Sequence, residues 1–351
     1  MKKNRIILVI LALFLINSFH KAQDIQFSQY TETPTNINPA LIGVQYNTRV
    51  ISNFRTQWGS VGTSYQTIGL SFEQAILAKK IKGSYFAVAL NLFRDAAGDA
   101  KLNMLNPNLG ISYIQKINKQ MKISGGLQSG LVYKTLDVNN LRWDKQYNGF
   151  EYSSSLPSGE NTTTRSSVTS YDFGGGINFN FAQSEKFFSS KDGNKFDIGF
   201  SAYHFNYTVN SFIVNSEKLY SRYCFYMNGD FNIPNSKNAI MPSLLYMKQG
   251  PNSQFLFGAL FKFILVDQSM YTTIKKPAAL SIGTQYRYKD AIIPVGLFQY
   301  DKYAIGISYD INVSPLTPAS KRNGGFEIML RYNITPGYGR NLGRSDSKAS
   351  Y

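Results

Sequence analysis

The amino-acid sequence predicts an all-β protein, a transmembrane antiparallel up-and-down β-barrel of about 14 strands. Three observations lead to this prediction: an N-terminus typical of exported proteins, repeated segments in which apolar and polar residues alternate, and a composition with 24 tyrosines, 25 phenylalanines and 28 glycines in 351 residues. After the first segment, no apolar run approaches the ~20 residues that a transmembrane helix needs. Membrane strands need only one apolar face, so such a chain can still span a bilayer.

The first 22 residues have the layout of a secretory signal peptide. A basic stretch (residues 2–5) precedes an unbroken apolar run (residues 6–16), and Ala22 stands before the expected cut. The apolar run is too short to span a bilayer as a helix, and its positive flank is typical of export signals. The alternative is a buried N-terminal helix. Cleavage would leave a polar segment, residues 23–47, at the start of the mature chain.

Alternation of apolar and polar residues is the main signal along the rest of the chain. Tyr303, Ile305 and Ile307 fall on one face of a strand and Ala304 and Gly306 on the other, because successive strand residues point to opposite faces. We expect strands near residues 48–58, 66–77, 85–95, 105–117, 122–136, 167–182, 196–206, 220–233, 238–250, 253–265, 278–288, 291–300, 302–313 and 324–334. Merging or splitting one pair would change the count to 12 or 16.

These strands place the barrel at residues 48–334 and leave a short polar tail, residues 335–351. Closure into a barrel is expected, because an open sheet of this size would expose long apolar edges. An even number of strands brings both ends of the barrel to the same side, which is the periplasm in single-chain bacterial barrels. We therefore expect an outer-membrane protein in contact with outer-membrane lipid, with both termini in the periplasm.

Aromatic residues stand near many of the expected strand ends. Amphipathic rings favour the membrane–water boundary, so these residues are expected to form the aromatic girdles of the barrel. The alternative is ordinary cross-strand packing in a soluble β-sandwich, which aromatics also favour. The girdle candidates are Trp58, Tyr85, Tyr133, Tyr288, Tyr300 and Tyr303.

The connections between the strands are unequal in length. Two late connections are tight turns, whereas residues 137–166 form a long excursion that keeps several aromatics. This loop follows the fifth strand, so it faces outside if the first strand rises from the periplasm. A long loop with aromatics is expected to be a packed plug or a binding surface. We select Trp143, Gln146 and Tyr147 as contact candidates; alternatively, Trp143 and Tyr147 only pack the loop onto the barrel wall.

Residues suited to catalysis or metal binding are scarce. Beyond the expected signal peptide the chain has one histidine, His204, and one cysteine, Cys224, and one of each cannot build a metal site. His204 stands among aromatics, where we expect a packed, hydrogen-bonded histidine rather than a catalytic one. Carboxylates such as Asp95 and Glu151 are expected in loops, without a partner motif. The sequence therefore predicts no enzyme, no cofactor and no metal.

Two further features have simple interpretations. The formal net charge is +16, but the basic residues are scattered and the chain is expected to be exported, so we expect no nucleic-acid partner. The glycine run at residues 174–176 lies inside an expected strand. A bulge, sharp curvature or the close approach of another chain segment explains it better than phosphate binding.

An ordered set of motifs resembles a known family. The stretch QDIQFSQYTETPTNINPALIG (23–43) is similar to the opening of mature PorP/SprF proteins of the type IX secretion system. The further matches, in order, are RVISNFRTQW (49–58), LRWDKQY (141–147), GFSAYHFNYTVNSF (199–212), PSLLYMKQG (242–250), RYKDAIIP (287–294), IGISYDINVS (305–314) and GGFEIMLRY (324–332). The resemblance thus covers nearly the whole mature chain.

The resemblance implies a non-enzymatic outer-membrane β-barrel that works with the type IX secretion machinery. Proteins of this family are linked to the secretion or surface attachment of cargo proteins, often adhesins whose C-terminal domain is a sorting signal. The resemblance also implies contact with periplasmic lipoprotein components of the machinery. The alternative function is an outer-membrane channel or transporter for small or hydrophobic solutes.

The opening segment then has a candidate role. In a barrel whose N-terminus starts in the periplasm, an ordered polar and aromatic segment can fold up into the lumen and occlude it. Prolines stiffen such a segment, and aromatic rings anchor it against the wall. The alternative is a merely structural clamp. The residues expected to fix this plug are Phe27, Tyr30, Pro34, Asn38 and Pro39.

Overall fold

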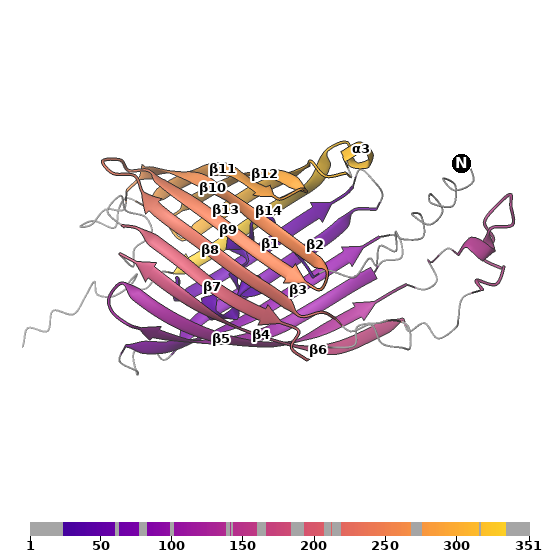
Figure 1. Cartoon of the computed structure of the whole chain (residues 1–351), viewed down its shortest axis with the longest axis horizontal. Coiled ribbons are helices and arrows are strands. Elements are labelled where there is room, and N and C mark those ends of the chain that lie inside the picture. The colour runs from indigo at the N-terminus through magenta and orange to yellow at the C-terminus, as the bar shows by residue number, and fades with distance from the viewer. Residues whose placement is uncertain are drawn as a thin grey trace, which may run out of the picture.

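A computed structural model shows one closed barrel of 14 strands, each hydrogen-bonded to its neighbours in antiparallel pairs (Figure 1). It describes residues 24–59, 63–76, 83–98, 102–137, 141, 143–159, 166–183, 193–206, 212, 219–267, 276–315 and 317–334. The expected signal peptide and C-terminal tail lie outside these residues. The predicted fold class and strand number are confirmed.

The strands follow one another around the barrel in chain order. They are β1 (Thr48–Gln57), β2 (Tyr65–Ile76), β3 (Ser84–Ala97), β4 (Leu102–Lys116), β5 (Met121–Thr135), β6 (Ser167–Ala182), β7 (Lys195–Tyr203), β8 (Arg222–Asn232), β9 (Ala239–Gln249), β10 (Asn252–Val266), β11 (Ala278–Arg287), β12 (Ala291–Tyr300), β13 (Tyr303–Asn312) and β14 (Asn323–Ile334). The short helical turns are η1 (Tyr30–Glu32), α2 (Pro34–Ile37), η2 (Pro39–Leu41), η4 (Asp144–Gln146) and α3 (Thr317–Ser320). No described helix is both long and apolar enough to cross a membrane.

Pairing of β1 with β14 closes the barrel. The register runs without interruption from Thr48 opposite Ile334 to Gln57 opposite Gly325. Because β1 starts where β14 ends, we call this end of the barrel the terminal end. The other end is called the loop end, since it bears the long β5–β6 connection (Figure 1).

The alternation places apolar side chains outside and polar ones inside. On β5, Leu127 is 66% exposed on the outer face while its neighbours Gly126 and Gln128 face the interior. On β13, Ile305 and Ile307 are likewise exposed, whereas Ser308 is buried. A soluble sandwich would bury its apolar face, so this arrangement is that of a membrane barrel.

Two residues are placed differently from what we expected: Tyr85 was expected in an aromatic girdle and Asp95 in a loop. Tyr85 is buried and points inward, where its hydroxyl donates a hydrogen bond to the carbonyl oxygen of Gly43 at 3.0 Å. The other five girdle candidates are 37–61% exposed. Asp95 lies within β3 rather than in a loop and accepts a 2.6 Å hydrogen bond from Thr67. Both lie at alternate positions of β3 on the same face as the buried Ala87 and Ala89, which is the face towards the interior.

The outward position of Leu127 yields a first prediction. Replacing Leu127 by arginine, near the middle of β5, puts a charge against lipid and should destabilise the barrel by about 2–4 kcal/mol. The free energy of unfolding in lipid vesicles, measured by urea titration, tests this. The matched control is Phe150→Arg in the long loop, which should change little. Equal losses in both variants would contradict the membrane-facing assignment of β5.

Candidate functional site

The lumen of the barrel contains residues 24–47, which we call the lumen segment (Figure 1, indigo). It consists of the three turns η1, α2 and η2 with short linkers, and most of its residues are buried. The five residues selected from the sequence for this segment, Phe27, Tyr30, Pro34, Asn38 and Pro39, are all buried inside the barrel. Their role as a plug remains a proposal.

The lumen segment first runs from the loop end towards the terminal end. The backbone N–H of Asp24 donates to the side chain of Gln249, the last residue of β9, at the loop end. Eight residues further on, the Glu32 carboxylate pairs with Arg331, close to where β14 finishes. Tyr30 between them donates its hydroxyl proton to Asn228 of β8 at 2.6 Å.

The segment then turns inside the lumen, and its second part runs to the terminal end. The carbonyl oxygen of Thr35 accepts a 3.2 Å hydrogen bond from Tyr203, the last residue of β7, at the loop end. The carbonyl oxygen of Val44 accepts from Lys122, near the start of β5, at the terminal end. The lumen segment thus follows a folded-back path inside the barrel rather than a single extended strand.

This path differs from the simple periplasmic origin that we expected. Asp24 lies at the loop end, whereas Ile334, the last residue of β14, lies at the terminal end next to Thr48. The described chain therefore begins and finishes at opposite ends of the barrel. That the terminal end faces the periplasm remains a prediction, based on strand parity and on the long loop.

A cluster of four charged wall residues holds the start of the segment. Arg55 and Arg287 both contact Oδ2 of Asp310, at 2.8 and 3.0 Å. Ser28 inserts here: its hydroxyl donates to Asp310 at 2.6 Å and its backbone N–H donates to Glu327 at 2.8 Å. Buried charges are costly unless paired and hydrogen-bonded, so the segment completes the pairing of this wall. We call these four wall residues and Ser28 the ionic cluster.

The side chain of Asn38 binds the barrel wall itself. Its amide donates to the backbone carbonyls of Ile177 and Phe200 at 2.8 and 3.3 Å, and it lies 3.2 Å from the Tyr226 hydroxyl. The approach is possible because residue 176 is glycine: a Cβ there would lie 2.2 Å from the Asn38 side-chain oxygen. Of the interpretations of the glycine run, close approach of another segment therefore applies at Gly176.

Pro39 and Ala40 make an equally close contact with β5. A Cβ on Gly126 would lie 2.4 Å from the carbonyl group of Pro39. Ser124, on the same inward face, donates a 2.7 Å hydrogen bond to the carbonyl oxygen of Ala40. Gly125 faces outward, and a Cβ there would meet nothing within 4 Å. Of these two adjacent glycines, only Gly126, which faces inward, makes room for the backbone of the lumen segment.

His204 anchors the first described residue of the segment. It follows β7 with a left-handed φ of 61°, and its ring nitrogens contact Asp172 at 2.7 Å and Asp24 at 2.5 Å. Burial disfavours the imidazolium, but the Asp24 carboxylate and the hydrogen bond to Asp172 outweigh it and raise the pKa of His204 to about 9. Arg222 also contacts Asp24, at 3.2 Å.

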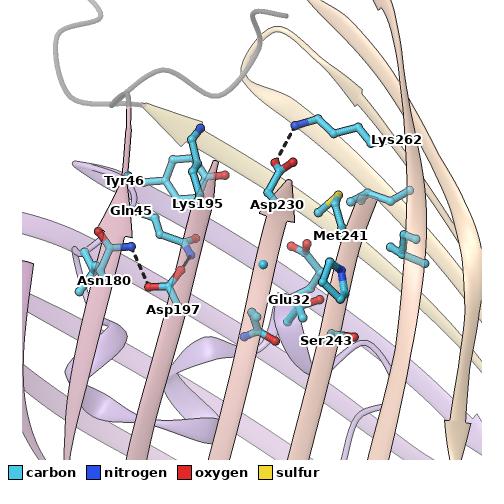
Figure 2. A pocket seen from close by; sticks show the side chains of 18 of the residues that line it. Glu32, Gln45, Tyr46, Asn180, Lys195, Asp197, Asp230, Met241, Ser243 and Lys262 are labelled. Atoms are coloured by element: carbon cyan, nitrogen blue, oxygen red, sulfur yellow. Dashed lines mark hydrogen bonds and ion pairs between the residues drawn. The ribbon is translucent and has the colours of Figure 1, made fainter. Parts of the chain in front are cut away.

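A cavity of about 140 Å³ remains at the terminal end, beside the lumen segment (Figure 2). We call it the terminal cavity. Asp197 on one side accepts hydrogen bonds from Asn180 at 2.8 Å and from Gln45 at 3.0 Å. On the other side Lys262 pairs with Asp230 at 2.9 Å. The cavity thus combines paired charges with open space.

The candidates in the long loop lie in a small folded unit at the loop end. Gln146 is buried, and its side chain accepts from the Trp143 N–H at 3.3 Å and the Tyr152 hydroxyl at 3.0 Å. Tyr147 is 57% exposed. Phe150, at the tip, is 95% exposed and was not selected from the sequence. Gln146 thus has a structural role, while the tip presents aromatic rings to solvent.

The sequence did not predict the ionic cluster either. Alternation placed Asp310 and Glu327 on the polar faces of their strands, but sequence spacing does not show that both meet Arg55 and Arg287 at one point. The signal that could have found them is the presence of charges on faces that must lie inside a barrel. Such charges require a partner in the lumen.

The family comparison decides what kind of barrel this is. Residues 19–332 match the family described as type IX secretion system membrane protein PorP/SprF. The chain belongs to the PorP/SprF family. Its fold is that of an outer-membrane β-barrel, and its family is that of a secretion-system membrane protein rather than an enzyme class. No curated protein matches the chain in sequence.

Solved structures similar to this PorP/SprF protein include other barrels, at low identity. CdiB from Acinetobacter baumannii is 9% identical with a TM-score of 0.38; the match covers 82% of this chain and 60% of CdiB. BamA from Haemophilus ducreyi, lacking POTRA domains 1–3, is 9% identical with a TM-score of 0.41, covering 82% and 70%. A mutant of the monoaromatic hydrocarbon channel TodX is 8% identical with a TM-score of 0.47, covering 87% and 94%.

The contact at Gly126 yields a second prediction. Replacing Gly126 by valine should expel the lumen segment or strain the barrel by about 1–3 kcal/mol, because overpacking of a close contact is destabilising. Limited proteolysis of the segment and ion conductance in planar bilayers should both increase. Gly125→Val is the matched control and should behave like the wild type. Equal protection of the segment in both variants would show that the contact does not hold it.

The His204 contacts yield a third prediction. A pKa raised to about 9 means that this contact stabilises the folded state fully below pH 6.5, the ordinary histidine value, and that the contribution is lost as the pH rises through 9. The loss should be on the order of 3 kcal/mol at most. Thermal unfolding between pH 6 and 10 should show this decline in the wild type and not in His204→Gln. Parallel profiles would contradict it.

Proposed function

We propose that this PorP/SprF-family barrel is a non-enzymatic accessory of the type IX secretion system that supports secretion or cell-surface attachment of a cargo protein, such as an adhesin, through the cargo's C-terminal sorting domain. The observation that carries this proposal beyond the family is the position of the lumen segment, which lies inside the barrel and contacts the wall near both of its ends. These contacts reduce the space through which a polypeptide could pass. Cargo is therefore expected at the ends of the barrel and not inside it.

The loop end supports contact with the cargo. Tyr147, Phe150 and Tyr152 are exposed on a compact unit in which the Tyr147–Tyr152 bridge and the side chain of Gln146 hold the tip. Aromatic residues dominate the energetics of protein interfaces, and a rigid scaffold lowers the entropy lost on binding. The opposite, terminal end is where periplasmic lipoprotein components of the machinery would contact the barrel.

The alternative function, a channel for small or hydrophobic solutes, has one observation in its favour. The terminal cavity shows that the lumen segment does not fill every part of the lumen. A steady conductance of the intact chain in planar bilayers would favour this alternative.

The proposed function yields a fourth prediction. Deletion of the gene should remove one or a few proteins from the cell surface or culture medium while other exported proteins stay unchanged. Comparison of the two proteomes measures this. Loss of every type IX cargo would indicate a core component instead, and an unchanged proteome would contradict the proposal.

A loop variant belongs in the same experiment. Tyr147→Ser combined with Phe150→Ser should lower surface cargo at least fivefold at an unchanged level of the barrel, because the aromatic tip is lost. Ser154→Ala with Ser155→Ala, exposed positions in the same loop, is the matched control. Cargo loss on gene deletion but not in the aromatic variant would keep the function and move the contact elsewhere.

A further inference from the structure

The terminal cavity has the size of a single side chain or chain end. Its volume of about 140 Å³ is close to the ~150 Å³ of a cavity known to take up benzene. The lumen segment forms part of its wall through Glu32, Gln45 and Tyr46, and strands of the barrel form the rest (Figure 2). A folded element is too large for this space.

Buried polar atoms on the cavity wall lack protein partners. Arg331 is only 6% exposed; its Nη1 binds Glu32, but its Nε and Nη2 have no partner among the described residues. Gln285 is 2% exposed, and its Oε1 also has no hydrogen-bond partner among the described residues. The same is true of Oδ1 of Asp230. Buried polar groups are normally hydrogen-bonded. These atoms have almost no accessible surface, so they are covered by the wall and do not face the open space of the cavity.

The charges of the cavity favour a ligand with a negative group. Basic side chains from three different strands, Lys122 of β5, Lys195 of β7 and Lys262 of β10, line it together with Arg331. Figure 2 shows Lys195 beside Tyr46 and Lys262 beside Asp230, on two sides of the cavity, and both lie higher in the view than Ser243. The carboxylates lining the cavity are fewer: Glu32, Asp197 and Asp230. A carboxylate among these cations would be attracted and could accept charge-assisted hydrogen bonds.

Part of the lining is apolar. Val44, Met241, Leu260 and Leu297 contribute aliphatic surface to the same cavity. Methionine adapts to irregular shapes, so this surface suits a small aliphatic group next to the carboxylate. A free inorganic anion would leave this aliphatic surface uncovered. A peptide end offers a carboxylate, an N–H donor and an aliphatic group within one or two residues.

We propose that the terminal cavity binds the C-terminal carboxylate of a polypeptide, inserted from the terminal end of the barrel. The site itself rests on the residues above; only the origin of the peptide, a secretion component or cargo, rests on the proposed function. The carboxylate lies among the lysines that line the cavity, and the neighbouring aliphatic group packs against Val44, Met241 and Leu260.

The test is a binding titration of the purified full-length barrel in detergent, in which calorimetry measures the heat of binding. The probes are acetyl-alanyl-leucyl-alanine with a free carboxylate, the same peptide as its C-terminal amide, and inorganic phosphate. The free acid should bind at least tenfold more tightly than the amide, and phosphate at equal concentration should not displace it. Lys195→Gln with Lys262→Gln should weaken binding at least fivefold, whereas Lys248→Gln, an exposed lysine on β9, should not.

Three results would overturn the proposal: no binding of the free acid, equal binding of acid and amide, or full displacement by phosphate, which would indicate a simple anion site. Thermal unfolding of each lysine variant shows whether it is folded. The outcome is separate from that of the proteome comparison. Cargo loss on gene deletion without peptide binding would contradict this inference alone. Peptide binding with an unchanged proteome would contradict the proposed function alone.

Discussion

The pairing of charges inside the barrel is the interaction on which the rest of the structure depends. The inner wall carries arginines and carboxylates that are almost fully buried, and they cannot remain so without partners. Ser28 supplies hydrogen bonds to Asp310 and Glu327, and Glu32 pairs with Arg331. The lumen segment is therefore part of the barrel's electrostatic balance, and not an appendage that happens to occupy space.

The same contacts connect the first strand of the barrel with the last two. Arg55 belongs to β1, Asp310 to β13 and Glu327 to β14, so the ionic cluster spans the strands at which the barrel closes. Seating of the lumen segment and closure of the barrel are thus coupled, because each supplies partners that the other needs. The inward glycines at 126 and 176 permit this by letting the backbone of the segment approach the wall. Polar pairing and close packing together give one specific position for residues 24–47.

The two ends of the barrel then have different chemistry. The loop end carries an ordered aromatic tip, centred on Phe150, and the anchor of Asp24 at His204. The terminal end carries a small cavity with an excess of basic side chains. The proposed function uses this asymmetry: cargo would contact the loop end, and secretion components would contact the terminal end.

The sequence by itself determined the strands, the barrel and the family, because alternation and motif order are local properties that survive without any knowledge of pairing. It also pointed to residues 23–47 as an ordered segment and to the long loop. Only the tertiary structure decided that Tyr85 and Asp95 face inward, that Asp24 lies at the loop end, and that the ionic cluster and the terminal cavity exist. These features join residues up to about 300 positions apart, and such contacts follow from the register and closure of the barrel, which no local pattern encodes.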